Sequence, residues 1–213
     1  MTAAPAGAPR DEAPRDEAPR DGAPRDAAGP VVHRAVIALG ANLGDREATL
    51  RAAAASIADT DGITVIAASS PVSSIALTLT GLDDSKPDYL NAVMIVDTVL
   101  EARALLAVLN GLEDAHGRTR DTRWGDRTLD LDIVQFGDVV SDDRGLTLPH
   151  PRAAERGFVL EPWSQIDPEA RLLNAGRVAD LLGRIPEAER TRVLPGAAPL
   201  WRPVAVAHPE RTS

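Results

Sequence analysis

Apolar and polar positions along the chain predict four strands and two main helices. Short apolar or alternating runs indicate strands at about 33–39, 64–72, 89–97 and 129–136. Asp45 follows a turn and can begin a helix through about residue 58. An amphipathic stretch indicates a second helix at about 101–116, with a stripe formed by Leu105, Val108, Leu109 and Leu112. The resulting order is β-α-β-β-α-β. It predicts an α+β fold with a ferredoxin-like core, in which helices pack on the faces of an antiparallel sheet.

The last predicted strand carries two acidic residues on one face. Residues two apart in a strand share a face, roughly 7 Å apart, so Leu129, Leu131 and Ile133 are expected in the core. Asp130 and Asp132 then point together to the other face. Two carboxylates at this spacing repel each other unless a cation neutralises them, and carboxylate oxygens suit Mg²⁺. An Asp-x-Asp is more often a solvated strand face, so by itself this pair leaves both interpretations open.

A basic loop immediately precedes this strand. It contains four arginines and a tryptophan: Arg118, Arg120, Arg123, Arg127 and Trp124. Guanidinium groups bind phosphate oxygens in a bidentate manner. Carboxylates for Mg²⁺ beside arginines for phosphate are what transfer chemistry on a nucleotide polyphosphate requires. The two features together predict a phosphate and metal site.

Charge and cysteine content exclude several classes of function. The chain has 32 Asp and Glu against 23 Lys and Arg, a net charge of −9, which disfavours nucleic acid and anionic membranes as partners. It has no cysteine, which excludes disulfides, thiolate catalysis and cysteine zinc sites. No apolar run approaches the length of a membrane span and no signal-peptide core is evident, so a cytoplasmic location is expected.

Both ends of the chain are expected to lie outside the folded domain. Residues 1–30 are of low complexity, and Ala-Pro-Arg-Asp recurs there at Ala8, Ala13, Ala18 and Ala23, a period of five residues with no large apolar side chain. Such a segment buries too little surface to offset its ordering entropy, so a disordered tail is expected. The expected folded domain is 31–194, and the Pro-rich residues 195–213 are expected to form a C-terminal tail.

Four sequence blocks resemble one enzyme family, in the order in which that family has them. The blocks are VIALGANLGDR at 36–46, PDYLNAV at 87–93, RTRDTRWGDRTLDLDI at 118–133 and LTLPHPRAAERGFVLEP at 146–162. They resemble 6-hydroxymethyl-7,8-dihydropterin pyrophosphokinase. The resemblance implies transfer of pyrophosphate from ATP to 6-hydroxymethyl-7,8-dihydropterin, with release of AMP, in folate biosynthesis. It also implies two Mg²⁺ ions as cofactors and small-molecule substrates only.

The resemblance assigns roles to individual residues. Metal ligands are Asp130 and Asp132, which with Arg118 and Arg127 form the catalytic set. The ATP contacts are Asn110, Glu113, Arg118, Arg120, Arg127, Ile133, Thr147, His150 and Arg156. The pterin contacts are Tyr89, Asn91, Trp124 and Phe158, with the two rings of Trp124 and Phe158 enclosing the flat heterocycle. Without the resemblance, Asn110 and Glu113 are interpreted as a solvated helix face and His150 as a structural residue.

The sequence departs from the family pattern at three places. Asp126 stands where the family usually has proline, and Asn110 where glutamine is common. The long connection 73–88, which corresponds to a mobile lid in the family, lacks the usual aromatic and proline positions. Residue-by-residue roles therefore do not transfer to this connection.

Three other functions remain as alternatives at this point. RNA-recognition modules share the predicted fold, but they place aromatic residues on central strands and are basic. A Mg²⁺-dependent nucleotidyl or glycosyl transferase would also use an Asp-x-Asp, but on a different nucleotide-binding frame. A non-enzymatic interaction domain is the third, if the altered connection abolishes pterin binding.

Overall fold

The computed structural model describes residues 29–78, 81–83, 88–116, 128–194 and 196–202. The chain divides into Met1–Pro30 and Val31–Ser213, and the description below concerns the second unit. Most of the expected N-terminal tail lies outside the described residues. The same holds for the four loop arginines, Trp124 and Asp126.

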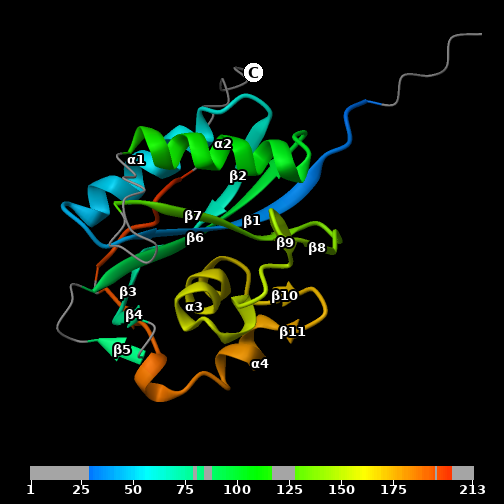
Figure 1. Cartoon of the computed structure of the whole chain (residues 1–213). Coiled ribbons are helices and arrows are strands. Elements are labelled where there is room, and N and C mark those ends of the chain that lie inside the picture. Colours follow the sequence, from blue (N-terminus) through cyan, green and yellow to red (C-terminus); the bar gives the residue numbers. More distant parts are fainter. Residues whose placement is uncertain (1–28, 79–80, 84–87, 117–127, 195, 203–213) are drawn as a thin grey trace, which may run out of the picture. The chain divides into compact units, whose positions relative to one another are not determined.

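A single antiparallel sheet forms the centre of the fold. Its strands are β1 (His33–Ala41), β2 (Ile63–Ala68), β3 (Val72–Ser74), β6 (Tyr89–Thr98), β7 (Asp130–Phe136) and β12 (Arg192–Val193). The order is β12-β3-β6-β1-β7, and β2 pairs with β6 beside β3. Strands β1 and β6 are therefore central, and β7 lies at an edge, as Figure 1 shows.

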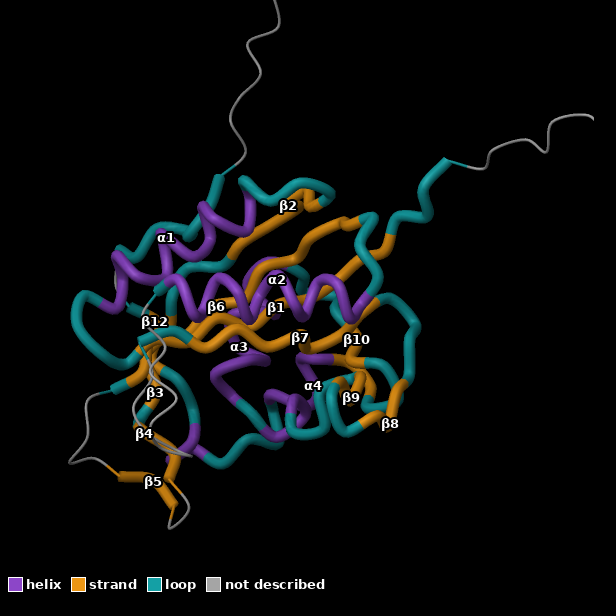
Figure 2. The backbone as a smooth tube through the Cα atoms, turned by 45° about the horizontal axis from the view of Figure 1, so that its top comes forward, coloured by secondary structure: helices purple, strands orange, loops and turns teal. Residues whose placement is uncertain are grey.

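Helices α1 (Arg46–Ala58) and α2 (Ala102–Ala115) cover one face of the sheet (Figures 1 and 2). Asp45 caps α1, because its side chain accepts a hydrogen bond from the Ala48 amide at 3.1 Å. The first core lies on this face and includes Ile37, Leu50, Met94 and Leu105. Alternate residues of each strand enter this core, as the sequence pattern predicts.

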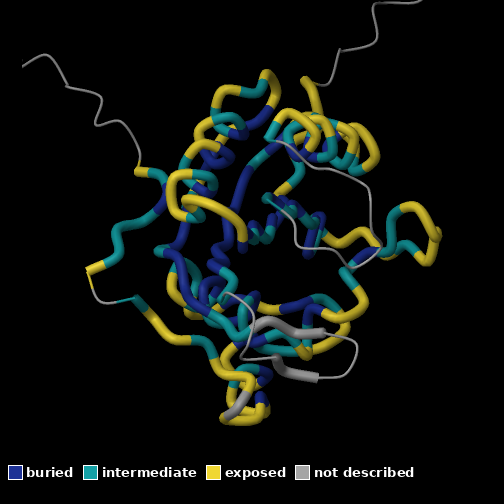
Figure 3. The backbone as a smooth tube through the Cα atoms, turned by 60° about the vertical axis from the view of Figure 1, so that its left-hand side comes forward, coloured by how far each residue is buried: buried dark blue, intermediate teal, exposed yellow. Residues whose placement is uncertain are grey.

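The opposite face is covered by α3 (Gly157–Ile166) and α4 (Val178–Leu182). A second core forms there, with Val36, Val93, Val134, Leu160 and Trp163 among its members. Both faces of the sheet are thus packed, and Figure 3 shows buried segments in the interior with exposed segments around them. The predicted α+β fold, an antiparallel sheet with helices on its faces, is confirmed.

Short elements complete the fold. Three hairpins are β4 (Ala76–Thr78) with β5 (Gly81–Asp83), β8 (Ser141–Asp143) with β9 (Leu146–Leu148), and β10 (Arg171–Leu172) with β11 (Gly176–Arg177). Single 3-10 turns are η1 (Ala153–Glu155) and η2 (Glu187–Glu189). No helix in the described part of the chain is both long and apolar enough to cross a bilayer.

The single strand predicted at 64–72 is wrong, because two strands, β2 and β3, occupy this region. Between them, Ser69 donates its amide to the Val93 carbonyl at 2.9 Å, and its hydroxyl accepts from the Val93 amide at 3.0 Å. A side chain thus replaces one main-chain partner of the ladder. Pro71 follows and has no amide hydrogen to donate, which ends regular pairing until Val72.

The segment after β12 packs on the domain rather than leaving it. Leu200 is buried in the first core, and Trp201 packs against that core. The Leu200 amide donates to the Ser69 carbonyl at 3.0 Å, and Arg51 of α1 donates to the Pro199 carbonyl at 3.2 Å. These two apolar residues fall within the expected C-terminal tail, yet the folded domain extends at least to Trp201.

Candidate active site

Two rows of side chains cross the sheet on its α3 face. The strand register aligns Asn91 of β6 with Gly40 of β1 and Asp130 of β7. The next row on this face pairs Ala38 with Asp132. On this face, β1 therefore has only the hydrogen of Gly40 and the methyl group of Ala38 between the larger side chains of β6 and β7. A Cβ at Gly40 would lie 3.3 Å from Asn91 Oδ1 and 4.0 Å from Asp130 Cβ, so glycine leaves room here for a ligand.

The strand β7 separates its acidic and apolar residues as predicted. Leu131 and Ile133 are buried in the first core, whereas Asp130 and Asp132 are half-buried on the opposite face. A register shift opposite Val36 and Ile37 lets Val134 enter the second core and returns Phe136 to the first. The prediction that the two aspartates share one face is confirmed.

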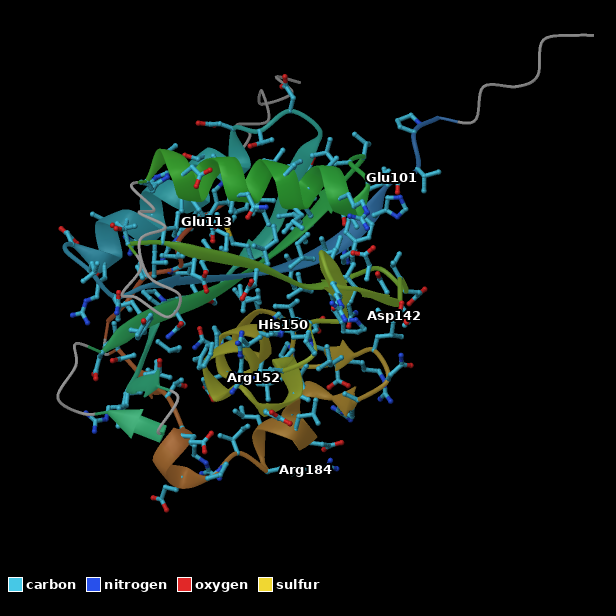
Figure 4. The ribbon with its side chains drawn as sticks, in the orientation of Figure 1. Glu101, Glu113, Asp142, His150, Arg152 and Arg184 are labelled. Atoms are coloured by element: carbon cyan, nitrogen blue, oxygen red, sulfur yellow. The ribbon has the colours of Figure 1, made fainter. Side chains whose placement is uncertain are left out.

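Two basic side chains from outside the sheet approach Asp132. His150 Nε2 lies 3.9 Å and Arg156 Nη1 3.6 Å from Asp132 Oδ2. The main chain of His150 is fixed to β7, because its amide donates to the Val134 carbonyl at 2.8 Å. Figure 4 shows His150 between β7 and α3. The fold thus brings together three residues that are far apart in sequence.

The imidazole of His150 lies between two nitrogen donors, one at each ring nitrogen. Its Nδ1 accepts a hydrogen bond from the Arg152 amide at 3.1 Å, and its Nε2 lies 3.4 Å from Arg156 Nη1. Nε2 is the nitrogen that faces Asp132. Burial lowers the pKa of His150, and the neighbouring Arg156 lowers it further, against an opposing effect of Asp132. Burial also lowers the pKa of Arg156, while Asp132 raises it.

This pKa shift predicts a pH-dependent stability. With its pKa below the ordinary 6.5, folded His150 stays neutral at a pH at which the unfolded chain binds a proton. The unfolding free energy is therefore expected to fall as the pH drops below 6.5. His150→Gln should flatten this part of the profile, measured by urea unfolding of metal-free protein from about pH 7 to about pH 5. Parallel profiles for the two proteins would contradict the assignment.

Phe158 lies next to this cluster, at the start of α3. The Arg156 guanidinium carbon is 5.4 Å from the centroid of the Phe158 ring, within cation–π range. Phe158 is half-buried against the second core, and Tyr89 is half-buried at the start of β6. Because Trp124 is outside the described residues, the expected enclosure of a flat ring by Trp124 and Phe158 stays a prediction.

Thr147 lies in β9, within the hairpin β8–β9. Its hydroxyl donates to the Asp143 carbonyl at 3.1 Å. The Asp143 carboxylate in turn accepts from Arg103 of α2 at 2.6 Å and from the Gly145 amide at 2.7 Å. These hydrogen bonds, the Gly145 amide first, hold the pKa of Asp143 below its ordinary value. An exposed ion pair thus connects the hairpin to the first turn of α2.

The two predicted ATP contacts on α2 differ in exposure. Asn110 is half-buried, whereas Glu113 is buried, so a solvated face is the wrong interpretation for Glu113. Glu113 Oε1 accepts a hydrogen bond from the Leu131 amide at 2.8 Å, on the edge of β7 between the two aspartates. Figure 4 shows Glu113 directed from α2 towards β7. Sequence reasoning missed this contact, whose only sequence signal was an acidic residue one turn beyond Leu109 on the apolar stripe.

Replacement of Glu113 is expected to destabilise the edge of the sheet. Glu113→Leu leaves the buried Leu131 amide without its acceptor, which costs about 1–3 kcal/mol of unfolding free energy. Glu113→Gln keeps an oxygen acceptor of the same reach and should retain most of this stability. Denaturant unfolding of the two variants measures the difference. Equal stability of the Leu and Gln variants would show that the hydrogen bond does not support β7.

Ile133 differs from the other predicted ATP contacts. Its side chain is buried in the first core. The main chain is therefore the part of Ile133 that could meet a nucleotide.

The donor set suits a hard cation that retains other ligands. Within the described ranges, no three His, Asp or Glu side chains gather as a complete metal cage. Asp130 and Asp132 offer oxygen atoms from one face, and the Asp132 side chain is 41% exposed. Mg²⁺ is commonly held by one or two carboxylates together with water and substrate phosphates. The site fits this mode of binding.

Comparison with known proteins identifies the family. The family model described as 7,8-dihydro-6-hydroxymethylpterin-pyrophosphokinase (HPPK) matches residues 36–168. The chain belongs to this family. The four sequence blocks and the aspartate pair all fall within the matched range or overlap it.

Relatives of the HPPK family support this assignment over most of their length. A 2-amino-4-hydroxy-6-hydroxymethyldihydropteridine pyrophosphokinase of Methylorubrum extorquens is 41% identical over 137 residues, which are 64% of this chain and 84% of the relative. The protein of the same description from Mycobacterium tuberculosis H37Rv is 40% identical over 173 residues, 75% of this chain and 88% of the relative. That of Pseudomonas aeruginosa is 36% identical over 167 residues, covering 78% of this chain and all of the relative.

Solved structures support the fold. The Plasmodium falciparum HPPK-DHPS A437G protein with STZ-DHP gives a TM-score of 0.57 at 13% identity. The match covers 74% of this chain and 46% of that longer protein. The activity assigned to this HPPK chain is pyrophosphoryl transfer to hydroxymethyldihydropterin in folate biosynthesis, with ATP as co-substrate.

Proposed function

We propose that Asp130 and Asp132 would hold two Mg²⁺ ions, which would neutralise charge on ATP, and that the side chains around them position the triphosphate for attack by the pterin hydroxyl. The observation that carries the proposal is the shared face of the two carboxylates, with Arg156 Nη1 at 3.6 Å and His150 Nε2 at 3.9 Å from Asp132. Carboxylates suited to a metal ion thus lie beside basic side chains suited to phosphate oxygens. This combination suits a magnesium–polyphosphate complex better than it suits Mg²⁺ alone or a polyphosphate alone.

The reaction breaks a phosphoanhydride bond of ATP and forms a phosphate ester bond to the pterin. The hydroxymethyl oxygen of the pterin attacks the β-phosphorus of ATP and loses its proton. The bond from the β-phosphorus to the oxygen that bridges to the α-phosphorus breaks, and AMP leaves with that oxygen. The products are the pterin diphosphate, AMP and one proton. Mg²⁺ bound at this site supplies charge neutralisation and lowers the pKa of a coordinated hydroxyl.

Protein side chains provide the remaining electrostatic stabilisation. Arg156 and His150 are placed to bind phosphate oxygens once ATP enters, with Thr147 contributing a hydroxyl from the hairpin. A polyanion there favours protonation of His150, whose pKa is lowered in the free protein. Arg118, Arg120 and Arg127 are proposed to complete the phosphate clamp from the loop. No general base is required if positioning and electrostatics carry the transfer, as they largely do in phosphoryl transfer.

The pterin is proposed to lie at the neighbouring row of the sheet. Asn91 is 5% exposed and its amide carries both a donor and an acceptor for the polar edge of the ring. Tyr89 and Phe158 are available as aromatic contacts, with Trp124 as the partner of Phe158. Because Asn91 and Asp130 flank Gly40, the pterin and the metal-bound phosphates are adjacent in this arrangement.

Asn110 and Glu113 remain proposed contacts for the adenosine part of ATP. Glu113 already uses Oε1 to accept from Leu131, so it acts on the nucleotide only alongside this role. We also propose a cytoplasmic location, since the reaction draws on ATP.

The function is tested by the identity of the nucleotide product. The protein is incubated with Mg²⁺, ATP and 6-hydroxymethyl-7,8-dihydropterin, and nucleotides are separated by ion-exchange chromatography. We expect AMP in equal amount to the pterin diphosphate, with formation abolished by EDTA or by omission of the pterin. ADP as the product, or AMP that forms without pterin, would contradict the proposal.

A further inference from the structure

Ser74 and Asn91 form a partly buried hydrogen bond that the mechanism above does not use. Asn91 Nδ2 donates to Ser74 Oγ at 2.9 Å. Val72 is directly opposite Asn91 in the β3–β6 pair, so Ser74 is its diagonal neighbour on the same face. Diagonal cross-strand neighbours remain within reach of side chains of this length.

The bond limits what the Asn91 amide can offer to a ligand. A primary amide has two N–H donors and one oxygen acceptor, and one of the donors is engaged by Ser74. The remaining N–H and Oδ1 form an adjacent donor–acceptor pair. Oδ1 lies over Gly40, 3.3 Å from the position that a Cβ would take, in the space shared with Asp130. The amide plane is thus fixed on the side where the pterin is proposed to bind.

A neighbouring hydroxyl makes a different contact and serves as an internal comparison. Ser73 Oγ donates to the Asp88 carboxylate at 2.9 Å, at the two ends of the connection between β3 and β6. The Asp88 carbonyl also accepts from Arg46 of α1. Ser73 therefore fastens the base of the connection, whereas Ser74 holds Asn91.

We propose that Ser74 is a positioning residue that determines specificity for the lactam edge of the pterin. This inference rests on the proposed placement of the pterin at Asn91. A lactam edge presents an N–H donor beside a carbonyl acceptor, which matches Oδ1 and the remaining N–H of the fixed amide. A ring with a 4-amino group in place of the carbonyl presents the inverse pattern. It would require the amide to turn over and give up the Nδ2–Oγ bond.

The test compares Ser74→Ala, Ser74→Thr and the matched control Ser73→Ala in the full chain. The KM for the hydroxymethyl dihydropterin, the KM for ATP and the inhibition constant of its 4-amino analogue are measured for each. In Ser74→Ala we expect the pterin KM to rise about fivefold because one hydrogen bond is lost. The ring preference, which is the inhibition constant of the 4-amino analogue divided by the pterin KM, should fall by about the same factor. The KM for ATP should not change.

The controls separate positioning from general disruption. Ser74→Thr keeps the hydroxyl and should restore both the pterin KM and the ring preference. Ser73→Ala should leave the ring preference at the wild-type value. An unchanged ring preference in Ser74→Ala, or an equal loss in Ser73→Ala, would overturn the inference. Wild-type protein that makes no AMP would instead refute the proposed function, so the two failures are distinguishable.

Discussion

Replacing Asp132 with alanine is expected to lower kcat on the order of a thousandfold, the upper range for loss of one preorganised electrostatic contact in a transition state. Asp132 is the carboxylate that faces both Arg156 and His150. Its loss removes a proposed metal ligand and leaves the Arg156 guanidinium without this neighbouring carboxylate. The measurement is steady-state AMP formation at saturating ATP and pterin over a range of Mg²⁺ concentrations.

A matched substitution separates this effect from a general loss of acidic charge. Asp142 is exposed on the hairpin β8–β9, as Figure 4 shows, and Asp142→Ala makes the same chemical change there. That variant should keep kcat within about twofold of wild type, as is usual for exposed positions away from a site. Near-normal turnover of Asp132→Ala would remove the metal assignment.

Arg156→Ala is expected to lower kcat by roughly a hundredfold or more. Arg156 is the one described arginine that lies within ion-pair distance of Asp132 and also stacks on Phe158. It therefore links the proposed phosphate region to the proposed pterin region. Arg156→Lys keeps the charge but loses the planar guanidinium, so an intermediate rate is expected.

The control for this second prediction is Arg177→Ala. Arg177 pairs with Glu169 at 3.0 Å on the hairpin β10–β11 and is partly exposed. Its removal should leave kcat unchanged. If Arg156→Ala and Arg177→Ala retain equal activity, Arg156 has no part in the transfer.

The local periodicity of β7 was sufficient to predict the orientation of its side chains. Leu131 and Ile133 enter the core and the two aspartates do not, as alternation requires. The same pattern could not predict the register shift that returns Phe136 to the first core. A bulge depends on the partner strand, and a single strand carries no signal for it.

Contacts between distant segments were beyond sequence patterns. The amide of Leu131 finds its acceptor in Glu113, and Asn91 finds Ser74, across loops whose course the pattern does not determine. Leu200 and Trp201 likewise looked like part of a tail, because a short Pro-rich segment has no periodicity of its own. Only the folded chain shows that their side chains pack against the first core.

The resemblance predicted more of the site than the residues alone. His150 and Arg156 had no local signal beyond their side-chain chemistry, yet both lie within 4.0 Å of Asp132. The arginines of the preceding loop and Trp124 lie outside the described residues, so their roles stay predictions. For an RNA-recognition module the acidic row on β7 is unsuitable, because it would repel the phosphate backbone.

The central claim is that Asp130 and Asp132 together hold the divalent ions that carry ATP. The most direct measurement is the number of Mn²⁺ ions bound per chain with a non-hydrolysable ATP analogue, determined by electron paramagnetic resonance. We expect about two ions per chain for the wild type, as in two-metal phosphoryl-transfer sites, and a loss of bound metal in the doubly substituted Asp130→Asn, Asp132→Asn protein. Equal Mn²⁺ binding by the two proteins would contradict the account.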